Sequence, residues 1–126
     1  MAAQIATVEE SHFGNVCRIK WTWTSATDGS VVKVTTGGFY GEVISLLTDP
    51  GSTAPTDNYD ITITDADGYD VMQGAGANRD TANTEQTVPT AKSVAFGPLT
   101  LNIATAGDQK TGVTVLLILG ARIPTA

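Results

Sequence analysis

Apolar and polar residues alternate along most of this 126-residue chain. In the stretch 16–24 one face carries only apolar side chains, namely Cys17, Ile19, Trp21 and Trp23. The opposite face carries Arg18, Lys20, Thr22 and Thr24. This period of two is typical of a β-strand with one buried face, so we interpret both tryptophans as core residues. No stretch repeats its apolar positions every three to four residues, and the pattern therefore predicts no long helix.

Similar segments, separated by turn residues, follow along the rest of the chain. We expect single strands over residues 16–24, 30–36, 39–48, 91–96, 99–104 and 112–119, and two strands within residues 59–72. Residues 4–9 and 85–88 are weaker candidates for short strands. Gly37-Gly38 allows a bend or bulge, and Gly97-Pro98 is predicted to end one strand before the next begins. The total of eight or nine strands predicts an all-β fold, an antiparallel β-sandwich with the jelly roll as one form. No internal repeat or linker indicates a second domain, so we treat residues 1–126 as a single domain.

A β-hairpin is predicted around Ala66-Asp67-Gly68. A three-residue loop with its glycine in the left-handed conformation places Ile63 opposite Val71 on the inner face. A two-residue loop would instead place Asp65 opposite Asp70, and two like charges in that arrangement cost stability. We therefore expect the three-residue loop.

The segment that follows the hairpin, residues 74–86, is polar, rich in small residues and without apolar periodicity. Long ordered segments of this kind in small domains are often functional. Two interpretations stay open: a solvated loop, or an intersubunit clamp in which the arginine fixes the geometry. As the clamp, the segment is the main contact with a partner, through Asn78, Arg79, Asp80 and Asn83.

The charge of the chain narrows the range of partners. Seven Lys and Arg residues against thirteen Asp and Glu residues give a net charge of −6. Nucleic acids and anionic membranes require clustered basic residues, so we expect neither as a partner. No apolar run approaches the length of about 20 residues that crosses a membrane. The first residues do not form a secretory signal, which predicts synthesis in the cytoplasm.

Five carboxylates within fourteen residues raise the hypothesis of a calcium site: Asp57, Asp60, Asp65, Asp67 and Asp70. The helix–loop–helix calcium motif fails here, because Gly68 at its sixth position puts Ile63 at the first, where a ligand is required. Turn formation explains the Asp-Gly pair without an ion. We expect no metal and no cofactor.

Candidates for catalysis are few. The single cysteine, Cys17, lies in an apolar stretch, and the single histidine, His12, has only Glu9 and Glu10 beside it in sequence. We interpret the first as a buried small side chain and the second as a surface residue. No arrangement of nucleophile, histidine and acid is recognisable, and Gly74-Ala75-Gly76 lacks the context of a dinucleotide site. The sequence therefore predicts a protein that is not an enzyme.

The stretches 54–71 and 74–86, with 99–103 and 112–115, resemble a family of small virion structural proteins of tailed bacteriophages. The resemblance implies a virion structural protein, located in the virion after synthesis in the host cytoplasm. Our leading hypothesis among virion roles is a capsid decoration (cement) protein that binds the major capsid protein and stabilises the head, because a small, acidic, one-domain β protein fits that role. We expect the major capsid protein or other virion proteins as partners, and a homo-oligomeric state. No catalytic residues come with the resemblance.

Two alternatives remain at the level of sequence. A tail or head–tail junction component would also need no chemistry of its own. A carbohydrate-binding or hydrolytic module would need Trp21 and Trp23 to be exposed as a stacking platform, or a pair of acids suitably placed.

Overall fold

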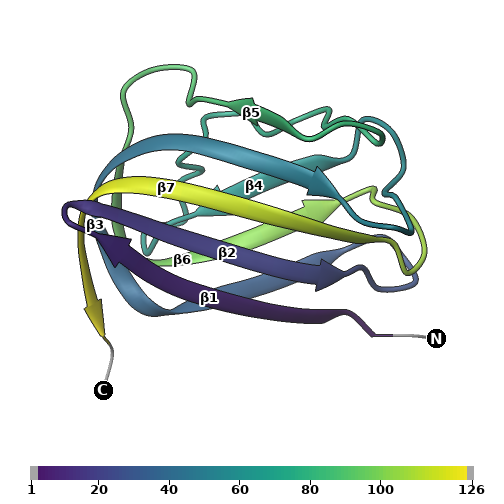
Figure 1. The fold of residues 1–126 in the computed structure, drawn as a ribbon, viewed down its shortest axis with the longest axis horizontal. Helices are drawn as coiled ribbons and strands as arrows, with labels where there is room; N and C mark the ends of the chain where they lie inside the picture. Colours follow the sequence, from purple (N-terminus) through teal and green to yellow (C-terminus); the bar gives the residue numbers. More distant parts are fainter. Residues whose placement is uncertain (1–2, 125–126) are drawn as a thin grey trace.

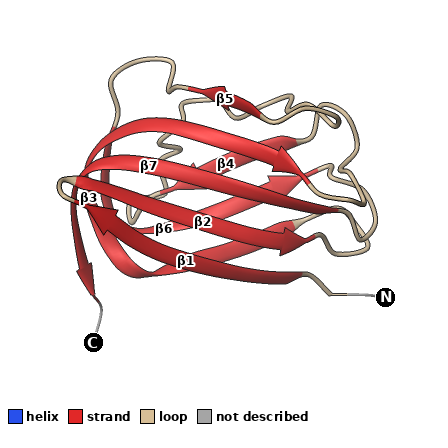
Figure 2. Ribbon diagram, viewed as in Figure 1, coloured by secondary structure: helices blue, strands red, loops and turns tan. Residues whose placement is uncertain are grey.

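Seven β-strands make up all the regular structure of residues 3–124, which are the residues that the structure, a computed structural model, describes (Figure 1). They are β1 (Ile5–Phe13), β2 (Val16–Thr24), β3 (Val31–Pro50), β4 (Asp60–Thr64), β5 (Glu85–Thr87), β6 (Val94–Ala104) and β7 (Thr111–Pro124). Strands and loops alone appear in Figure 2, and the described residues contain no helix. Within the same residues, nothing of the length and apolar character of a membrane-crossing helix is found.

All strands pair antiparallel in one sheet of the order β1-β2-β7-β3-β6-β4, and the short β5 adds to β3. The long strand β3 connects two parts of this sheet. Its residues 31–42 pair with β6, and its residues 37–50 pair with β7. Figure 1 shows β3 curling at one end of the molecule, so that β4 and β6 lie behind β1, β2 and β7. The sheet thus folds over its own core.

The core is built from the inward faces predicted by the alternation. Its largest fully buried side chains include Trp21, Trp23, Phe39 and Tyr59. Burial of an indole requires a partner for its N–H group. Nε1 of Trp21 donates to the carbonyl oxygen of Lys33 at 3.1 Å, and Nε1 of Trp23 donates to Oγ1 of Thr114 at 3.1 Å. The prediction that both tryptophans are core residues is confirmed.

Two side chains, Glu10 of β1 and Gln4 just before it, close the gap between this edge strand and the first half of β3. The amide group of Gln4 exchanges two hydrogen bonds with the backbone of Val32, as a neighbouring peptide would. The carboxylate of Glu10 accepts hydrogen bonds from the N–H of Thr36 at 2.7 Å, the hydroxyl of Thr36 at 2.7 Å and the N–H of Gly37 at 3.0 Å. Nε of Arg122 donates to the same carboxylate at 2.8 Å. Backbone groups at an otherwise open sheet edge are thereby satisfied.

The expected number of eight or nine strands is wrong, because two predicted breaks do not interrupt a strand. Gly37-Gly38 lies inside β3 and Gly97-Pro98 lies inside β6. In the ladder Gly38 is the partner of Pro98, and Gly97 is the partner of Phe39. A register shift between Val34 and Gly38 marks the bulge, so both strands bend together and continue. The expected two-sheet sandwich is not confirmed, since every strand belongs to one hydrogen-bonded sheet.

The hairpin prediction is confirmed in its register and wrong in its second strand. Gly68 has a φ of 79°, and the N–H of Val71 donates to the carbonyl of Ile63 at 2.8 Å. Instead of a second strand, however, the residues after the turn form one isolated bridge, between Asp70 and Thr64 at the end of β4. The chain turns away after this bridge because the carboxylate of Asp70 takes over the hydrogen bonds that a second strand would have made.

Candidate functional site

The segment after the hairpin runs back along the outer edge of β4 rather than projecting into solvent. Arg79 forms a bridge with Tyr59, with its N–H donating to the Tyr59 carbonyl at 2.7 Å. The N–H of Ile61 donates to the carbonyl of Gly76 at 2.9 Å. Gly76 is buried and lies so close to β4 that a Cβ there would collide with the carbonyl of Ile61. The segment therefore covers a sheet edge that would otherwise be open to pairing.

Asp70 organises the start of this segment. Its Oδ1 accepts the N–H groups of Ile63 at 3.2 Å and Met72 at 3.0 Å, and its Oδ2 accepts the N–H of Gly74 at 2.9 Å. An ionised carboxylate is a strong acceptor for backbone N–H groups. The role of Asp70 is thus to fix a tight turn between the β4 edge and the polar segment.

Three further carboxylates of the acidic cluster serve neighbouring turns in the same way. Asp57 accepts the N–H of Thr81 at 3.3 Å, and Asp60 accepts the N–H of Asn78 at 3.0 Å. Asp65 accepts the N–H groups of Asp67 and Tyr69. Across residues 3–124 no three His, Cys, Asp or Glu side chains are grouped so as to hold a metal ion. These acids act as hydrogen-bond acceptors for the loop backbone.

The guanidinium group of Arg79 is engaged within the chain. Nε and Nη2 donate to the carbonyl of Ala77 at 3.2 and 3.1 Å, and Nη1 lies 3.3 Å from Oε1 of Glu85. The side chain of Arg79 is only 13% exposed. The same Glu85 oxygen accepts the N–H of Asp80 at 3.0 Å. Arg79 consequently holds the segment to the start of β5, and a partner could use it only by displacing these bonds.

Beneath the segment lies the buried ring of Tyr59, whose centroid is 5.9 Å from that of Trp23. Burial raises the pKa of Tyr59 to about 12, and the neighbouring Thr48 hydroxyl offsets only part of this effect. Neither hydroxyl has a hydrogen bond of normal geometry with the described residues. The phenol is therefore neutral and serves packing.

The outward face of the segment is formed by the remaining predicted contact residues. Asn78 and Asn83 are exposed, and Asp80 is half-buried. The carboxylate of Asp80 accepts the N–H of Ala82 at 2.8 Å and the Nδ2 group of Asn83 at 3.0 Å, and these bonds lower the pKa of Asp80. Asn78 holds a φ of 58°, which asparagine tolerates better than most residues. The structure thus brings the four residues into one ordered loop that presents amide and carboxylate groups.

The one histidine and the one cysteine lie opposite each other in the β1–β2 ladder, which the sequence did not reveal. Cys17 is buried, and its Sγ donates to the carbonyl of Gly120 at 3.7 Å. Burial raises the pKa of this thiol, more than the charge of Arg122 lowers it. A thiolate nucleophile requires the opposite shift. The pair His12 and Cys17 therefore lacks the electrostatics of an activated nucleophile.

Neither a protein-family model nor a curated protein sequence matches this chain. The function must accordingly be argued from the geometry of the residues themselves.

Sequence reasoning missed the contact between Glu10 and Arg122, which are 112 positions apart. A signal for it was present, because Glu10 alternates with Ala6 and Val8, and both of these pack against the core. A charged residue at an inward position of a strand calls for a buried partner. The apolar end of the molecule, described below, was also missed.

Proposed function

We propose that the chain is a virion structural protein of a tailed bacteriophage, most simply a capsid decoration (cement) protein that binds the major capsid protein and stabilises the head. It would act there as a binding module and not as an enzyme. The sheet folded over its own core would serve as the scaffold for the contact loop, in the manner of a β-sandwich or jelly roll. The alternative is a component of the tail or of the head–tail junction, and the experiment below distinguishes it from a decoration protein.

The observation that carries this proposal is the ordered conformation of residues 70–84, which comprise the end of the hairpin and most of the polar segment. Ordering a polar loop costs about 1–2 kcal/mol of backbone entropy per residue. Here the hydrogen bonds of Asp57, Asp60 and Asp70 offset part of that cost before any partner arrives. A loop that is already ordered binds with a smaller entropic penalty. Asn78 and Asn83 would then form the outward contacts.

The charge around the loop indicates the chemistry of the partner surface. Thr84 donates to Asp49 at 2.9 Å, and Asp57, Asp60 and Asp80 surround the same loop. Arg79, the basic residue of this loop, is already paired with Glu85. We therefore expect the capsid surface to offer Arg, Lys or amide donors, with binding that weakens as salt is raised.

The experiment is co-sedimentation of the purified protein with heads and, separately, with tails of the phage that encodes it. The variant Asn78→Gly/Asn83→Ala removes both exposed amides, and glycine retains the left-handed backbone at 78. Its matched control is Gln109→Gly/Asn15→Ala, because Gln109 has a φ of 51° and Asn15 is exposed in the β1–β2 turn.

We expect the wild type and the control to sediment with heads, and the double variant to bind at least about tenfold more weakly. Equal binding by the double variant would reject the loop as the contact. Binding to tails and not to heads would favour the tail component, and binding to neither would overturn the proposal. Point substitutions are preferable to deletion of residues 75–84, because deletion would uncover the edge of β4.

A further inference from the structure

One end of the molecule carries a concentration of exposed apolar side chains. Of the eleven large apolar residues exposed in the described chain, seven lie there: Phe13, Ile44, Val88, Val94, Phe96, Leu119 and Ile123. We call this set the apolar end. Exposure is substantial, at 71% for Phe13, 60% for Val94 and 46% for Leu119. Single exposed apolar residues are normal, whereas a contiguous group of this kind marks an interaction site.

The pairing of the strands makes these residues neighbours. Phe13 is the partner of Val16, which is the partner of Leu119. Leu119 is the partner of Glu42, and Glu42 is the partner of Val94. Directly opposite side chains in an antiparallel pair stand about 5 Å apart on one face. One row therefore crosses five strands from β1 to β6 on the outer face of the sheet.

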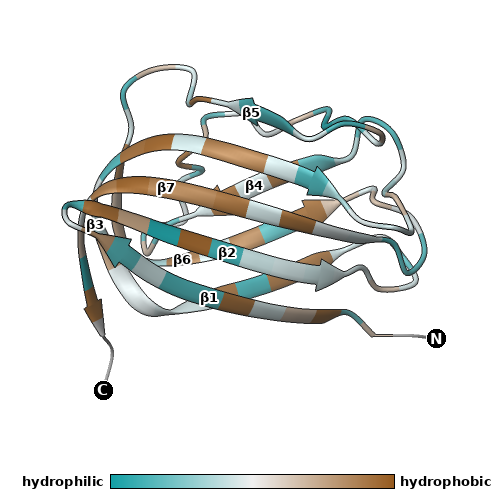
Figure 3. Cartoon of the chain, in the orientation of Figure 1, coloured by the Kyte–Doolittle hydropathy of each residue, from teal (hydrophilic) through white to brown (hydrophobic). Residues whose placement is uncertain are grey.

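A second row lies two residues further along the same face. Tyr40 is the partner of both Phe96 and Ala121 in the ladders, and the rings of Tyr40 and Phe96 pack edge to face with centroids 5.0 Å apart. Ile123 continues the β7 side of this face opposite Gly38. In Figure 3 the apolar colouring of β7 continues to this end of the molecule.

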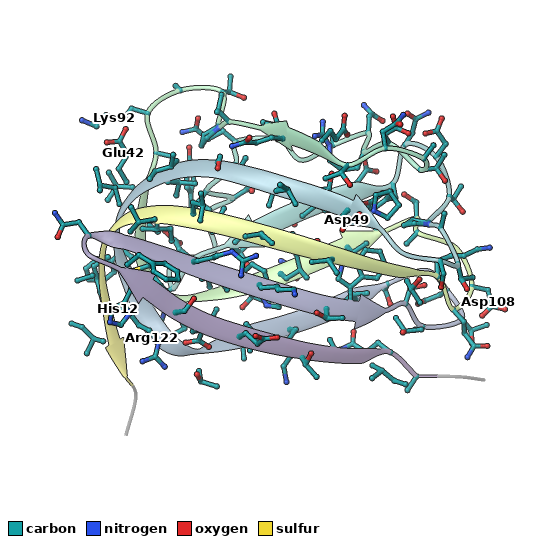
Figure 4. The ribbon with its side chains drawn as sticks, in the orientation of Figure 1. His12, Glu42, Asp49, Lys92, Asp108 and Arg122 are labelled. Carbon is teal, nitrogen blue, oxygen red and sulfur yellow. The ribbon has the colours of Figure 1, made fainter. Side chains whose placement is uncertain are left out.

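Between the rows and the segment after β5 lies a surface groove of about 610 Å³. Its apolar lining includes Ile44, Val88 and Leu119, and its two charged residues are Glu42 and Lys92. Neither of these forms an ion pair within the described chain. Figure 4 shows both at the same end of the molecule, away from Asp49. The groove thus carries one unpaired charge of each sign beside apolar surface.

We propose that the apolar end binds a second copy of this chain in a two-fold symmetric dimer. A two-fold interface brings one patch against itself, so the patch must be complementary to itself. The apolar end is complementary to itself in shape, since it carries both a groove and projecting apolar side chains. It is also complementary to itself in charge, because Glu42 of each copy would face Lys92 of the other.

The size of the apolar end fits the central part of such an interface. Four strand spacings of about 4.8 Å make the first row about 20 Å long, measured along the curved sheet. Interfaces of standard size bury about 800 Å² on each partner and consist of an apolar centre within a polar rim. This interface is independent of the virion proposal, because the loop with Asn78 and Asn83 lies at the Asp49 end of the molecule.

The first test is sedimentation velocity of the full chain across a range of concentrations up to about 1 mM, which reaches weak affinities. We expect a reversible dimer for the wild type. Leu119→Asp and Val94→Asp should each shift the monomer–dimer transition to at least about tenfold higher concentration. Ile5→Asp is the matched control, because Ile5 is 68% exposed but lines a different pocket with Trp23 and Thr111.

The second test exchanges the charges. Glu42→Lys alone and Lys92→Glu alone should each weaken the dimer, because each places like charges opposite one another. The double variant should restore it. A mixture of the two single variants should form a heterodimer, since both of its contacts are then attractive. Glu9→Lys, an exposed site on β1, controls for the change in net charge.

Circular dichroism of each variant keeps loss of folding separate from loss of association. A wild type that stays monomeric over the whole range would overturn the proposal. An oligomer that Leu119→Asp and the charge exchanges leave unchanged would overturn it as well. Variants that lose the dimer but still bind heads would show that the dimer contact and the proposed capsid contact are separate surfaces.

Discussion

At the scale of single residues, Glu10 is the least expected feature of the molecule. Its side chain is 3% exposed, yet its carboxylate meets Thr36, Gly37 and the guanidinium of Arg122. Removing one partner from a buried, charge-assisted network leaves the others unsatisfied, which costs more than a single exposed hydrogen bond. The network joins β1 to β3 and to the end of β7, and no backbone ladder pairs β1 with either of these strands.

We therefore expect Glu10→Gln to lower the free energy of unfolding by about 2–3 kcal/mol. Glutamine retains the size of the side chain but loses the charge that pairs with Arg122. The measurement is the midpoint of urea unfolding. Glu9→Gln is the control, because Glu9 is exposed on the same strand and should change the free energy by less than about 0.5 kcal/mol. Equal midpoints for the two variants would show that the network adds no stability.

The same network predicts a dependence of stability on pH. Burial opposes ionisation of Glu10, but the hydrogen bonds from Thr36, Arg122 and Gly37 outweigh it and lower the pKa of Glu10. A lowered pKa in the folded state means that the stabilisation is present above the unfolded-state pKa and is lost as the pH falls through the folded-state pKa. We expect the unfolding free energy of the wild type to decline below about pH 4.3. In Glu10→Gln this decline should be shallower, and identical pH profiles would contradict the assignment.

At the scale of elements, the segment over residues 70–84 is both an edge cover and a candidate contact. Asp70→Ala removes the acceptor of three N–H groups, those of Ile63, Met72 and Gly74. We expect the segment to detach from β4 locally while the rest of the sheet stays folded. Hydrogen exchange should then become faster at Ile61, whose N–H bonds to Gly76. Unchanged exchange there, together with unchanged exchange in β2, would show that Asp70 does not hold the cover in place.

Elements of the fold were predictable where one strand carried its own pattern. The expected stretch 16–24 is β2 as the structure has it, because alternation there decides the buried face without help from elsewhere. The boundaries failed at Gly37-Gly38 and Gly97-Pro98, which look like breaks in isolation. They pair with one another across the β3–β6 ladder, and only that tertiary pairing keeps both strands continuous. Local propensity could not contain this information.

The candidate loop was predictable in position but not in the orientation of its side chains. Sequence indicated Arg79 as an anchor, whereas the structure pairs it with Glu85 and turns it toward Ala77. Six positions separate Arg79 from Glu85, and a long polar loop gives no periodicity from which such a contact could be predicted. Of the four predicted contact residues, Asn78 and Asn83 are the two that are exposed.

At the scale of the whole molecule, the two ends differ in chemistry. One end carries the polar loop with Asp49, Asp57 and Asp80, and the other carries the apolar end with Leu119 and Val94. Figure 4 shows Asp49 and Asp108 at the first end and Glu42, Lys92, His12 and Arg122 at the second. The proposed capsid contact and the proposed dimer contact therefore use opposite ends of the molecule, and each can be tested with the other intact.

The most direct measurement of the central claim is a count of this chain in purified virions by quantitative mass spectrometry, relative to the major capsid protein. The account predicts many copies per particle in a fixed ratio to the major capsid protein. It also predicts that washing at high salt removes them, because the acidic loop end would bind through screened charges. Absence of the chain from purified virions would contradict the account.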